Sequence, residues 1–133
     1  MDQQHKEELL SAAVQAAERA YAPYSKFQVG AALRGKNDVI YRGVNVENAS
    51  YGLTNCAERS AIFNAISDGE RQFDLIAIAS PGGVAPCGAC RQVLHEFAPD
   101  INILLIDTSG KKQVTELSLS MLLPHAFFGL EEN

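Results

Sequence analysis

The sequence predicts an α/β fold, a three-layer α/β/α sandwich around a mixed sheet of about five strands, from three observations. Two stretches of alternating apolar and polar residues, joined by a turn at 35–38, indicate a β-hairpin over residues 27–47. Two nearly continuous apolar runs, at 74–81 and 101–107, are typical of strands that are covered on both faces. A helical segment separates these runs, so the three together form a βαβ unit.

The other elements follow in chain order. In residues 2–20 apolar side chains recur at helical spacing, and this helix ends before Pro23. Helical spacing returns at 56–68, where Gly69 supplies a C-terminal stop. The crossover helix of the βαβ unit covers residues 88–98. Residues 112–117 add an edge strand, and residues 117–129 end the chain with a short helix and an aromatic tail.

Length and composition predict one domain. A chain of 133 residues with 47% apolar residues can bury one sizeable core and is too short for two ordinary domains. The sequence contains no internal repeat, no low-complexity tract and no linker rich in Pro, Gly or Ser. We therefore expect residues 1–133 to form a single domain.

The charge of the chain disfavours a nucleic-acid partner. The net charge is −5, from 11 basic and 16 acidic residues, whereas binding to many phosphates requires a basic face. Residues 1–8 are polar and lack the apolar core of a signal peptide. No apolar run approaches the roughly 20 residues that span a bilayer. We expect a soluble, cytoplasmic protein.

Three cysteines are the main candidates for chemistry. Cys87 and Cys90 form a C-x-x-C pattern after Pro86, and Cys56 lies 30 intervening residues upstream of Cys87. In a reducing cytosol, cysteines bind metal or do chemistry more often than they form disulfides. Both cysteine segments begin predicted helices, whose N-termini carry partial positive charge and favour the thiolate. Three thiolates at two helix ends suit a zinc ion.

The predicted zinc site is open at one position. Structural zinc sites usually have four protein ligands, while catalytic sites have three and leave the fourth position to water. His5, His95 and His125 are scattered, and we expect them to be ordinary histidines and not a fourth ligand. Two other interpretations stay open. The C-x-x-C could be a redox pair, which leaves Cys56 without a role, or the site could be a structural knuckle of three cysteines and one histidine.

Glu58, in the segment "NCAER", has two possible roles. In a capping box, Asn55 caps the helix and Glu58 bonds back to the cap amide. As a general base, Glu58 would act on the water at the open zinc position. It would not bind the metal beside Cys56, because residues two apart do not share a helical face. From the first turn of the helix, however, its side chain could reach that water. We expect Asn55 to be the cap and the carboxylate to point toward that position. Arg59 and Arg91 are placed around the cysteines, where each could donate a hydrogen bond to a cysteine sulfur or could be a solvated surface residue.

Several stretches of the chain together resemble one known family. "CAER" followed by "PCGACRQ" is similar to the cytidine deaminases, in the short form with three cysteines where relatives use one histidine and two cysteines. The similarity also includes "YAPYSKFQVGAAL" at 21–33, "GVNVENASYGLTNCAERSA" at 43–61, "APCGACRQ" at 85–92 and "LLPHAF" at 122–127. The resemblance implies the cytidine deaminase fold. It also implies zinc-dependent hydrolysis of cytidine, and of deoxycytidine, to the uracil nucleoside and ammonia in pyrimidine salvage.

The resemblance further implies roles for individual residues at the centre of the site. One zinc ion per chain would bind Cys56, Cys87 and Cys90. Glu58 would transfer protons, first as a base and then as an acid, so its pKa should lie near the working pH. These assignments make the single domain a catalytic one.

A substrate-binding set is implied in the same way. Asn45 and Glu47 lie two apart on a predicted strand, hence on one face, and would hydrogen-bond the ribose hydroxyls. Phe27 is similar to the aromatic that packs on the pyrimidine, and the Ala57 amide would meet a polar edge of the base. From the residues alone, Phe27 could equally belong to the core, and Asn45 and Glu47 could be a solvated strand end.

The resemblance also implies a homotetramer with shared active sites. Phe127 matches a tail aromatic that enters the site of a neighbouring subunit, and Tyr51 would lie at that shared wall. On base rates, however, a terminal aromatic pair such as Phe127 and Phe128 more often packs on its own domain. The expected partners are a small nucleoside and further copies of the chain, with no nucleic acid and no membrane.

Other functions stay open beside this one. The substrate could be a related aminated heterocycle such as blasticidin S or free cytosine, although Asn45 and Glu47 favour a ribose. A tRNA adenosine deaminase is disfavoured by the acidic charge and by the cysteine at the first ligand position. In a different class, a structural zinc module that binds another protein predicts four ligands and no release of ammonia.

Overall fold

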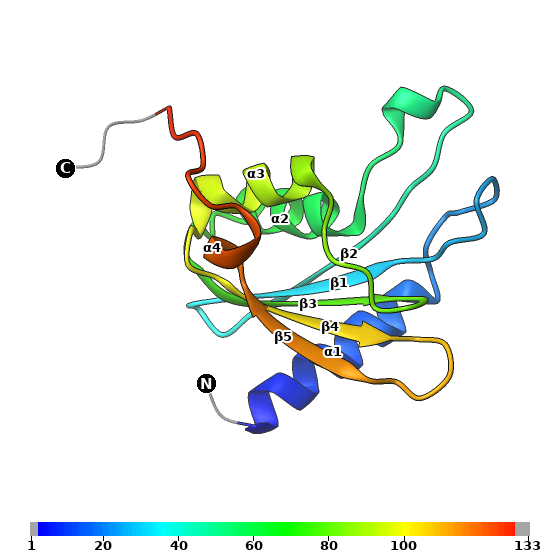
Figure 1. Cartoon of the computed structure of the whole chain (residues 1–133), viewed down its shortest axis with the longest axis horizontal. Coiled ribbons are helices and arrows are strands. Elements are labelled where there is room, and N and C mark those ends of the chain that lie inside the picture. Colours follow the sequence, from blue (N-terminus) through cyan, green and yellow to red (C-terminus); the bar gives the residue numbers. More distant parts are fainter. Residues whose placement is uncertain (1–2, 130–133) are drawn as a thin grey trace.

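A five-stranded sheet in the order β2-β1-β3-β4-β5 lies at the centre of the computed structural model, which describes residues 3–129 (Figure 1). Its strands are β1 (Gly30–Gly35), β2 (Ile40–Val44), β3 (Phe73–Ser80), β4 (Asn102–Asp107) and β5 (Val114–Ser118). β3 and β4 are parallel, and the other neighbouring pairs are antiparallel. The mixed sheet and the βαβ unit that the sequence predicts are therefore confirmed.

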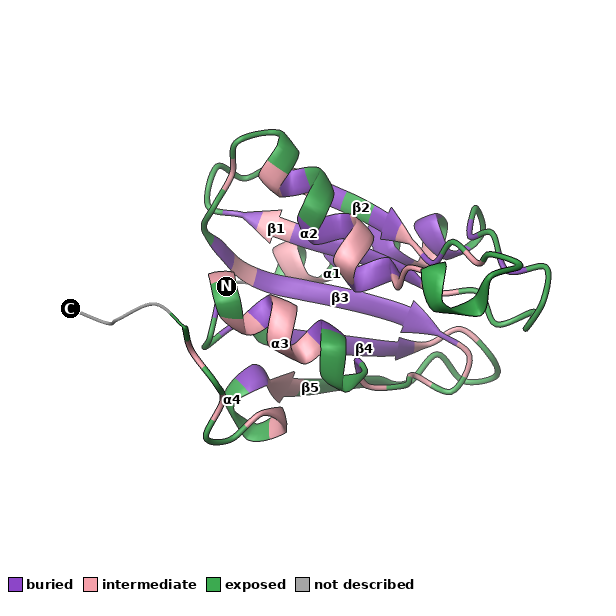
Figure 2. Ribbon diagram, turned by 90° about the horizontal axis from the view of Figure 1, so that it is seen from above, coloured by how far each residue is buried: buried purple, intermediate pink, exposed green. Residues whose placement is uncertain are grey.

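Helices cover both faces of this sheet. They are α1 (Gln3–Ala17), α2 (Ala57–Ser67), α3 (Gly88–Phe97) and α4 (Leu119–Leu122), while the 3-10 turn η1 (Tyr51–Leu53) lies in the projecting loop between β2 and α2 (Figure 1). α1 lies on one face, whereas α2 and α3 lie side by side on the other, which gives the predicted three-layer sandwich (Figures 1 and 2). Among residues 3–129, none of the helices combines the length and the apolar character that a membrane span requires.

The central strand β3 connects the two hydrophobic cores. Its side chains alternate between the faces, as the pleat of a strand requires. Ile76 and Ile78 pack with α2 and α3 on one side, while Leu75 and Ala77 pack with α1 on the other, and all four are buried. A strand buried on both faces reads as a continuous apolar run, which is why this strand was recognisable in the sequence.

Two glycines allow the helices to lie close to the sheet. A Cβ atom on Gly30 of β1 would be 2.3 Å from Ala13 O in α1. A Cβ atom on Gly43 of β2 would be 2.3 Å from Ala61 N and 2.4 Å from Ala57 O in α2. No other residue fits at such a distance. Gly43 therefore sets the depth at which the N-terminal turn of α2 sits on the sheet.

The predicted start of α2 is wrong by one residue. Cys56, and not Asn55, is the N-cap, and Ser60 N donates to Cys56 O at 3.0 Å. The reason is that Asn55 is held in extended backbone by a bridge to Val46, with two hydrogen bonds of 3.0 Å, so the helix begins after it. The Asn55 side chain donates to Ser60 Oγ at 3.1 Å.

The hairpin strands are shorter than predicted at the end nearest the cysteines. β1 begins at Gly30 and not at Phe27, and β2 ends at Val44. The cause is the side chain of Asn45, which accepts from Val29 N at 2.9 Å and donates to Phe27 O at 2.8 Å. One backbone bond persists here, from Asn45 N to Val29 O at 3.2 Å, and the Asn45 side-chain amide makes the other contacts to residues 27–29.

Candidate active site

The three cysteines converge where α2 and α3 begin. Their sulfur atoms all lie within 4.8 Å of one another, and the Sγ atoms of Cys87 and Cys90 are 3.5 Å apart. All three are free thiols. A tetrahedral zinc ion with Zn–S bonds of about 2.3 Å would separate its sulfur ligands by about 3.8 Å. The cluster therefore fits a zinc ion bound by Cys56, Cys87 and Cys90.

The helix starts explain why these sulfurs are available to a metal. Cys56 is the N-cap of α2 and Cys87 is the N-cap of α3, yet neither side chain caps its helix with a hydrogen bond. Cys90 lies in the first turn of α3 and is fully buried. The partial positive charge of two helix N-termini therefore acts on thiols that are not used as caps.

Neighbouring groups make the first thiolate easy to form. The Cys56 sulfur accepts hydrogen bonds from the Cys90 thiol and from Arg59, whose Nη2 lies 3.2 Å away. These bonds lower the pKa of Cys56 to about 5, although burial acts in the opposite direction. The bond to the Cys56 sulfur and burial raise the pKa of Cys90. The Cys56 thiolate is thus favoured in the metal-free protein, while a bound cation would favour deprotonation of Cys90.

Glu58 lies next to the cluster without belonging to it. Its side chain is 6% exposed, and burial raises the pKa of its carboxyl. Among residues 3–129, no histidine nitrogen or carboxylate oxygen completes the group of three sulfurs as a fourth ligand. The arrangement therefore has three protein ligands and a buried carboxyl whose pKa is shifted upward, as proton transfer near neutral pH requires.

A cavity of about 190 Å³ opens onto this carboxyl and onto Cys56. Apolar side chains from β3 and from the loop before α3 form much of its wall, and a few polar groups interrupt them. It is lined by Phe27, Val29, Asn45, Thr54, Asn55, Cys56, Ala57, Glu58, Ile78, Ser80, Val84 and Ala85. A small, mostly apolar cavity with a few polar groups suits a flat heterocycle.

Three of the predicted substrate residues line this cavity. Phe27 is exposed at its wall and is not a core residue, and Ala57 also lines it and is fully buried. Asn45 is also buried, and its amide already makes one donor and one acceptor bond to residues 27–29. An amide can make two bonds of each kind, so one N–H and one lone pair of Asn45 remain for a ligand.

Glu47 and Tyr51 line a neighbouring hollow instead. This hollow has a volume of about 180 Å³ and shares Thr54 with the cavity. Glu47 accepts hydrogen bonds from Tyr24 N at 2.9 Å, from Ser25 N at 3.1 Å and from the Ser25 hydroxyl. The Ser25 hydroxyl and these amides hold the pKa of the Glu47 carboxyl below its usual range. The predicted pair Asn45 and Glu47 is thus divided between two adjoining hollows.

The tail aromatic lies outside the cavity of its own chain. Phe127 is 77% exposed and is absent from the cavity lining, and Tyr51 is 87% exposed. The backbone of the tail is fixed beside α3, because Gln92 Nε2 donates to Phe127 O at 2.9 Å and the ring of Phe128 meets His95 edge to face. Phe127 is therefore presented to the solvent by a tail that is tied to the domain.

Arg91 donates to backbone carbonyl groups and not to a cysteine sulfur, a choice that the sequence left open. Arg91 Nε donates to Pro86 O at 2.7 Å, and Nη1 donates to Leu122 O at 2.9 Å. Its position in α3 directs the guanidinium toward carbonyl groups of the preceding loop and of α4. Arg91 thereby supports the backbone just before Cys87, whereas Arg59 makes the sulfur contact.

Sequence reasoning did not find the residues that the loop between β3 and α3 contributes. Ser80 ends β3 and is buried, and Val84 and Ala85 follow it in the cavity wall. The signal for Ser80 was a polar residue at the C-terminal end of a buried strand, where α/β sheets place their ligand sites. Val84 and Ala85 carry no comparable signal, since their role depends on how the loop folds back.

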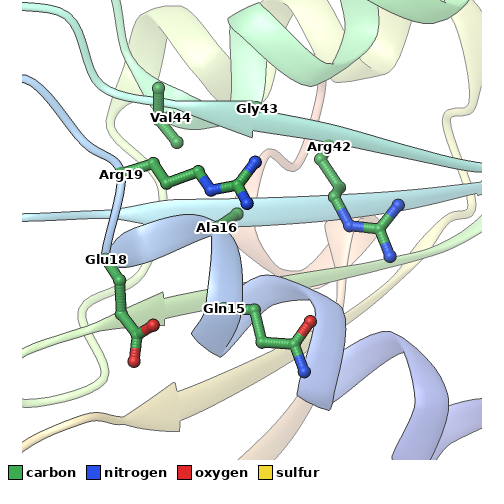
Figure 3. A pocket seen from close by; sticks show the side chains of 7 residues that line it. All are labelled: Gln15, Ala16, Glu18, Arg19, Arg42, Gly43 and Val44. Atoms are coloured by element: carbon green, nitrogen blue, oxygen red, sulfur yellow. The ribbon is translucent and has the colours of Figure 1, made fainter.

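A larger hollow of about 710 Å³ lies elsewhere, between the end of α1 and β2 (Figure 3). It is lined by Gln15, Ala16, Glu18, Arg19, Arg42, Gly43 and Val44. None of these residues is a cysteine or a histidine, and the cavity beside the thiols has no lining residue in common with it. The chemistry of the site therefore lies in the smaller cavity.

The fold and this site define the class of protein. Residues 3–105 match the family model described as the "cytidine and deoxycytidylate deaminase zinc-binding region", so the class is that of the zinc-binding deaminases. The chain belongs to the cytidine deaminase family. A cytidine deaminase from Halalkalibacterium halodurans is 50% identical over 128 residues, which cover 94% of this chain and 96% of that protein.

Solved structures agree with this assignment. A crystal structure of cytidine deaminase from Burkholderia pseudomallei superposes with a TM-score of 0.86 at 47% identity, and the match covers 96% of this chain and all of that chain. A blasticidin-S deaminase from Bacillus cereus is more distant, at 34% identity over 110 residues, or 75% of this chain and 76% of that protein. These similar proteins are all deaminases, and none is a purely structural zinc module.

Proposed function

We propose that the chain catalyses the hydrolytic deamination of cytidine and deoxycytidine to the corresponding uracil nucleosides. The observation that carries the proposal is the buried carboxyl of Glu58, which lies beside three converging thiols at a cavity of about 190 Å³. In this reaction a C–O bond forms at carbon 4 of the ring, the C–N bond breaks, and water and cytidine give uridine and ammonia.

The residues of the cavity have distinct parts in this reaction. A zinc ion on Cys56, Cys87 and Cys90 would supply the Lewis acidity that makes water a nucleophile at neutral pH. Glu58 takes a proton from the attacking water and delivers protons to the adjacent ring nitrogen and to the leaving amine. Its burial favours the protonated form, so it holds the proton between these transfers.

The walls of the cavity orient the base. Phe27 packs against one face of the pyrimidine, and the amide of Ala57 meets a polar edge of the ring. Asn45 keeps one N–H and one lone pair for a ribose hydroxyl, and Glu47 is within the adjoining hollow, where the sugar would extend. Ligand binding there would compete with the bonds that Glu47 makes to residues 24 and 25.

The assembly proposed is a homotetramer of one-domain subunits with shared sites. Phe127 and Tyr51 are supported in this role by their exposure, because neither packs on its own domain. The protein would work in the reducing cytoplasm, since its three thiols must stay reduced to bind metal. Recovery of uracil nucleosides from cytidine would place it in pyrimidine salvage.

Turnover and metal content of one purified sample test the proposed function. Zinc-loaded protein should convert cytidine and deoxycytidine, as measured by ultraviolet absorbance and by ammonia release. Glu58→Gln should keep about one zinc per chain and lose at least about a thousandfold in kcat, because general acid–base transfer is removed. Glu96→Gln, at an exposed position of α3, is the matched control and should stay active. Wild-type turnover in Glu58→Gln would contradict the role of Glu58.

The same assay separates cytidine from the alternative substrates. Blasticidin S and free cytosine are offered beside cytidine at equal concentration. If the ribose contacts of Asn45 and Glu47 are right, cytidine should have the highest kcat/KM of the three. A preference for blasticidin S or cytosine would replace the proposed substrate while leaving the deaminase class intact.

A further inference from the structure

The loop of residues 81–86 has two structural roles. It connects β3 with α3, and Val84 and Ala85 within it form part of the cavity wall. Pro86 is fully buried, and Cys87, the N-cap of α3, follows it directly. A displacement of the first turn of this loop would therefore move the wall that faces the base, while the buried Pro86 anchors the loop just before Cys87.

One carboxylate from the neighbouring strand holds the first turn of this loop. Asp107 ends β4, opposite Ser80 at the end of β3. Its Oδ1 accepts hydrogen bonds from Gly82 N at 2.7 Å, from Ser109 N at 2.8 Å and from Ser109 Oγ at 2.7 Å. The Ser109 hydroxyl and the Gly82 amide hold the pKa of this carboxyl below its usual range, so it is ionised at neutral pH.

The turn that Asp107 holds has little stiffness of its own. Gly82 and Gly83 both adopt positive φ, at 85° and 62°, and glycine has the widest backbone freedom of all residues. Beyond them, Val84 N donates to Ser80 Oγ at 3.0 Å, and Gly83 N donates to Ser80 O at 3.0 Å. Asp107 is thus connected to the wall residue Val84 through the backbone of Gly82 and Gly83, and Ser80 binds the Val84 amide.

We propose that Asp107 is a positioning residue for the deamination, which acts by fixing the Gly82–Gly83 turn and thereby the Val84–Ala85 wall of the cavity. It does not line the cavity, so it acts through the loop and not on the substrate. The proposal rests on the proposed function for its substrate, because the wall matters to the nucleoside that packs against it.

Substitutions at Asp107 distinguish this role from a general loss of stability. Asp107→Ala removes the acceptor, whereas Asp107→Asn keeps an oxygen at Oδ1 but loses the charge, which roughly halves the strength of such a bond. Asp100→Ala is the matched control, since Asp100 is an exposed aspartate before the start of β4. All variants are studied as zinc-loaded, full-length protein.

Two measurements are made on each variant. Steady-state kinetics with cytidine should give a KM raised about tenfold in Asp107→Ala with kcat little changed, because a charge-assisted hydrogen bond is lost. Asp107→Asn should lie between Asp107→Ala and the wild type, and Asp100→Ala should match the wild type. Hydrogen exchange of peptides that cover residues 81–90 should be faster in Asp107→Ala, with no change in Asp100→Ala.

The outcomes separate this proposal from the proposed function. Unchanged KM and unchanged exchange in Asp107→Ala would overturn the positioning role. If Asp107→Ala does not fold, Asp107→Asn is compared with the wild type in the same two measurements. A KM and an exchange rate of Asp107→Asn equal to those of the wild type would then overturn the proposal. A wild-type protein that does not deaminate cytidine would contradict the substrate assignment, while the exchange measurement would still test Asp107.

Discussion

The guanidinium of Arg59 offsets part of the negative charge at the thiol cluster. Three thiolates and one divalent zinc ion sum to a net charge of −1, which weakens the activation of water compared with a site that has a neutral histidine. Arg59 Nη2 donates to Cys56 Sγ at 3.2 Å, and this thiolate raises the pKa of Arg59 above its ordinary value. A cationic donor at one sulfur therefore favours both the thiolate and the bound metal.

Replacing Arg59 should make zinc binding more sensitive to acid. Together with the Cys90 thiol, Arg59 lowers the pKa of Cys56 to about 5, so the thiolate persists above that pH. In Arg59→Gln this pKa rises, protons compete with zinc up to a higher pH, and zinc is lost earlier on acidification. We expect zinc affinity to fall about tenfold in mildly acidic buffer. Competition with a chromophoric chelator over a pH series measures it.

The conservative variant supplies the control for this experiment. Arg59→Lys retains the positive charge but not the planar donor group, so its zinc affinity should lie between those of Arg59→Gln and the wild type. The difference in zinc affinity between the variants should shrink as the pH rises, since protons then compete less with zinc for the Cys56 sulfur. Equal zinc affinity of Arg59→Gln and wild type at every pH would show that the contact has no effect on the metal.

Residue identity and spacing predicted the centre of the site but not its surroundings. Cys56, Cys87 and Cys90 stood out because helix starts favour the thiolate that a metal binds, and Glu58 stood out because it lies two residues after Cys56. The bonds of Glu47 to residues 24 and 25 depend on a loop that folds back across the chain, and no local pattern encodes that return. The direction of the Arg91 side chain likewise depends on where α4 lies.

At the scale of elements, the position of α2 on the sheet decides where the thiols meet. The backbone of Gly43 in β2 lies against the first turns of α2, and a Cβ there would come within 2.4 Å of Ala57 O. Ala57 is the first residue of α2, directly between Cys56 and Glu58. The glycine in the strand therefore controls the position of both functional side chains.

Gly43→Ala should destabilise the protein and disturb the site together. The added methyl group meets backbone atoms that cannot rotate away, and overpacking of this kind costs about 1 to 3 kcal/mol. Urea unfolding should show this loss of stability, and zinc affinity should fall because α2 must shift outward. Gly52→Ala is the control, since a Cβ on Gly52 meets nothing within 4 Å. Equal unfolding free energies and zinc affinities for the two variants would contradict this account.

Element order was more predictable than element ends. All five strands and the long helices could be read from periodicity, because burial on one or both faces leaves a pattern over many residues. The ends moved where tertiary hydrogen bonds compete with the local pattern. Asn45 takes residues 27–29 out of β1, and the bridge between Val46 and Asn55 delays the start of α2. Neither contact is visible at short sequence separation.

At the scale of the whole molecule, the single chain leaves several large apolar side chains exposed. The loops around residues 18–29 and 45–56 project from the same end of the sheet (Figures 1 and 2). They carry Tyr24, Tyr51 and Leu53, each more than half exposed, and the tail carries Phe127. Exposed apolar groups on loops that border a cavity mark a surface for a partner, and a second copy of the chain is the partner proposed.

Subunit mixing tests whether Phe127 completes the site of a neighbouring chain. Glu58→Gln subunits lack the proton carrier, and Phe127→Ala subunits should bind cytidine with a KM raised at least about tenfold, as for a buried aromatic anchor. In mixed oligomers some sites combine an intact Glu58 with an intact Phe127 from the other subunit. Activity at low cytidine should then exceed that of Phe127→Ala alone, while sedimentation confirms a tetramer.

The control mixes Phe127→Ala with the double variant Glu58→Gln/Phe127→Ala, which cannot form such sites. If both mixtures have equal activity, Phe127 does not complete the site of a neighbouring chain.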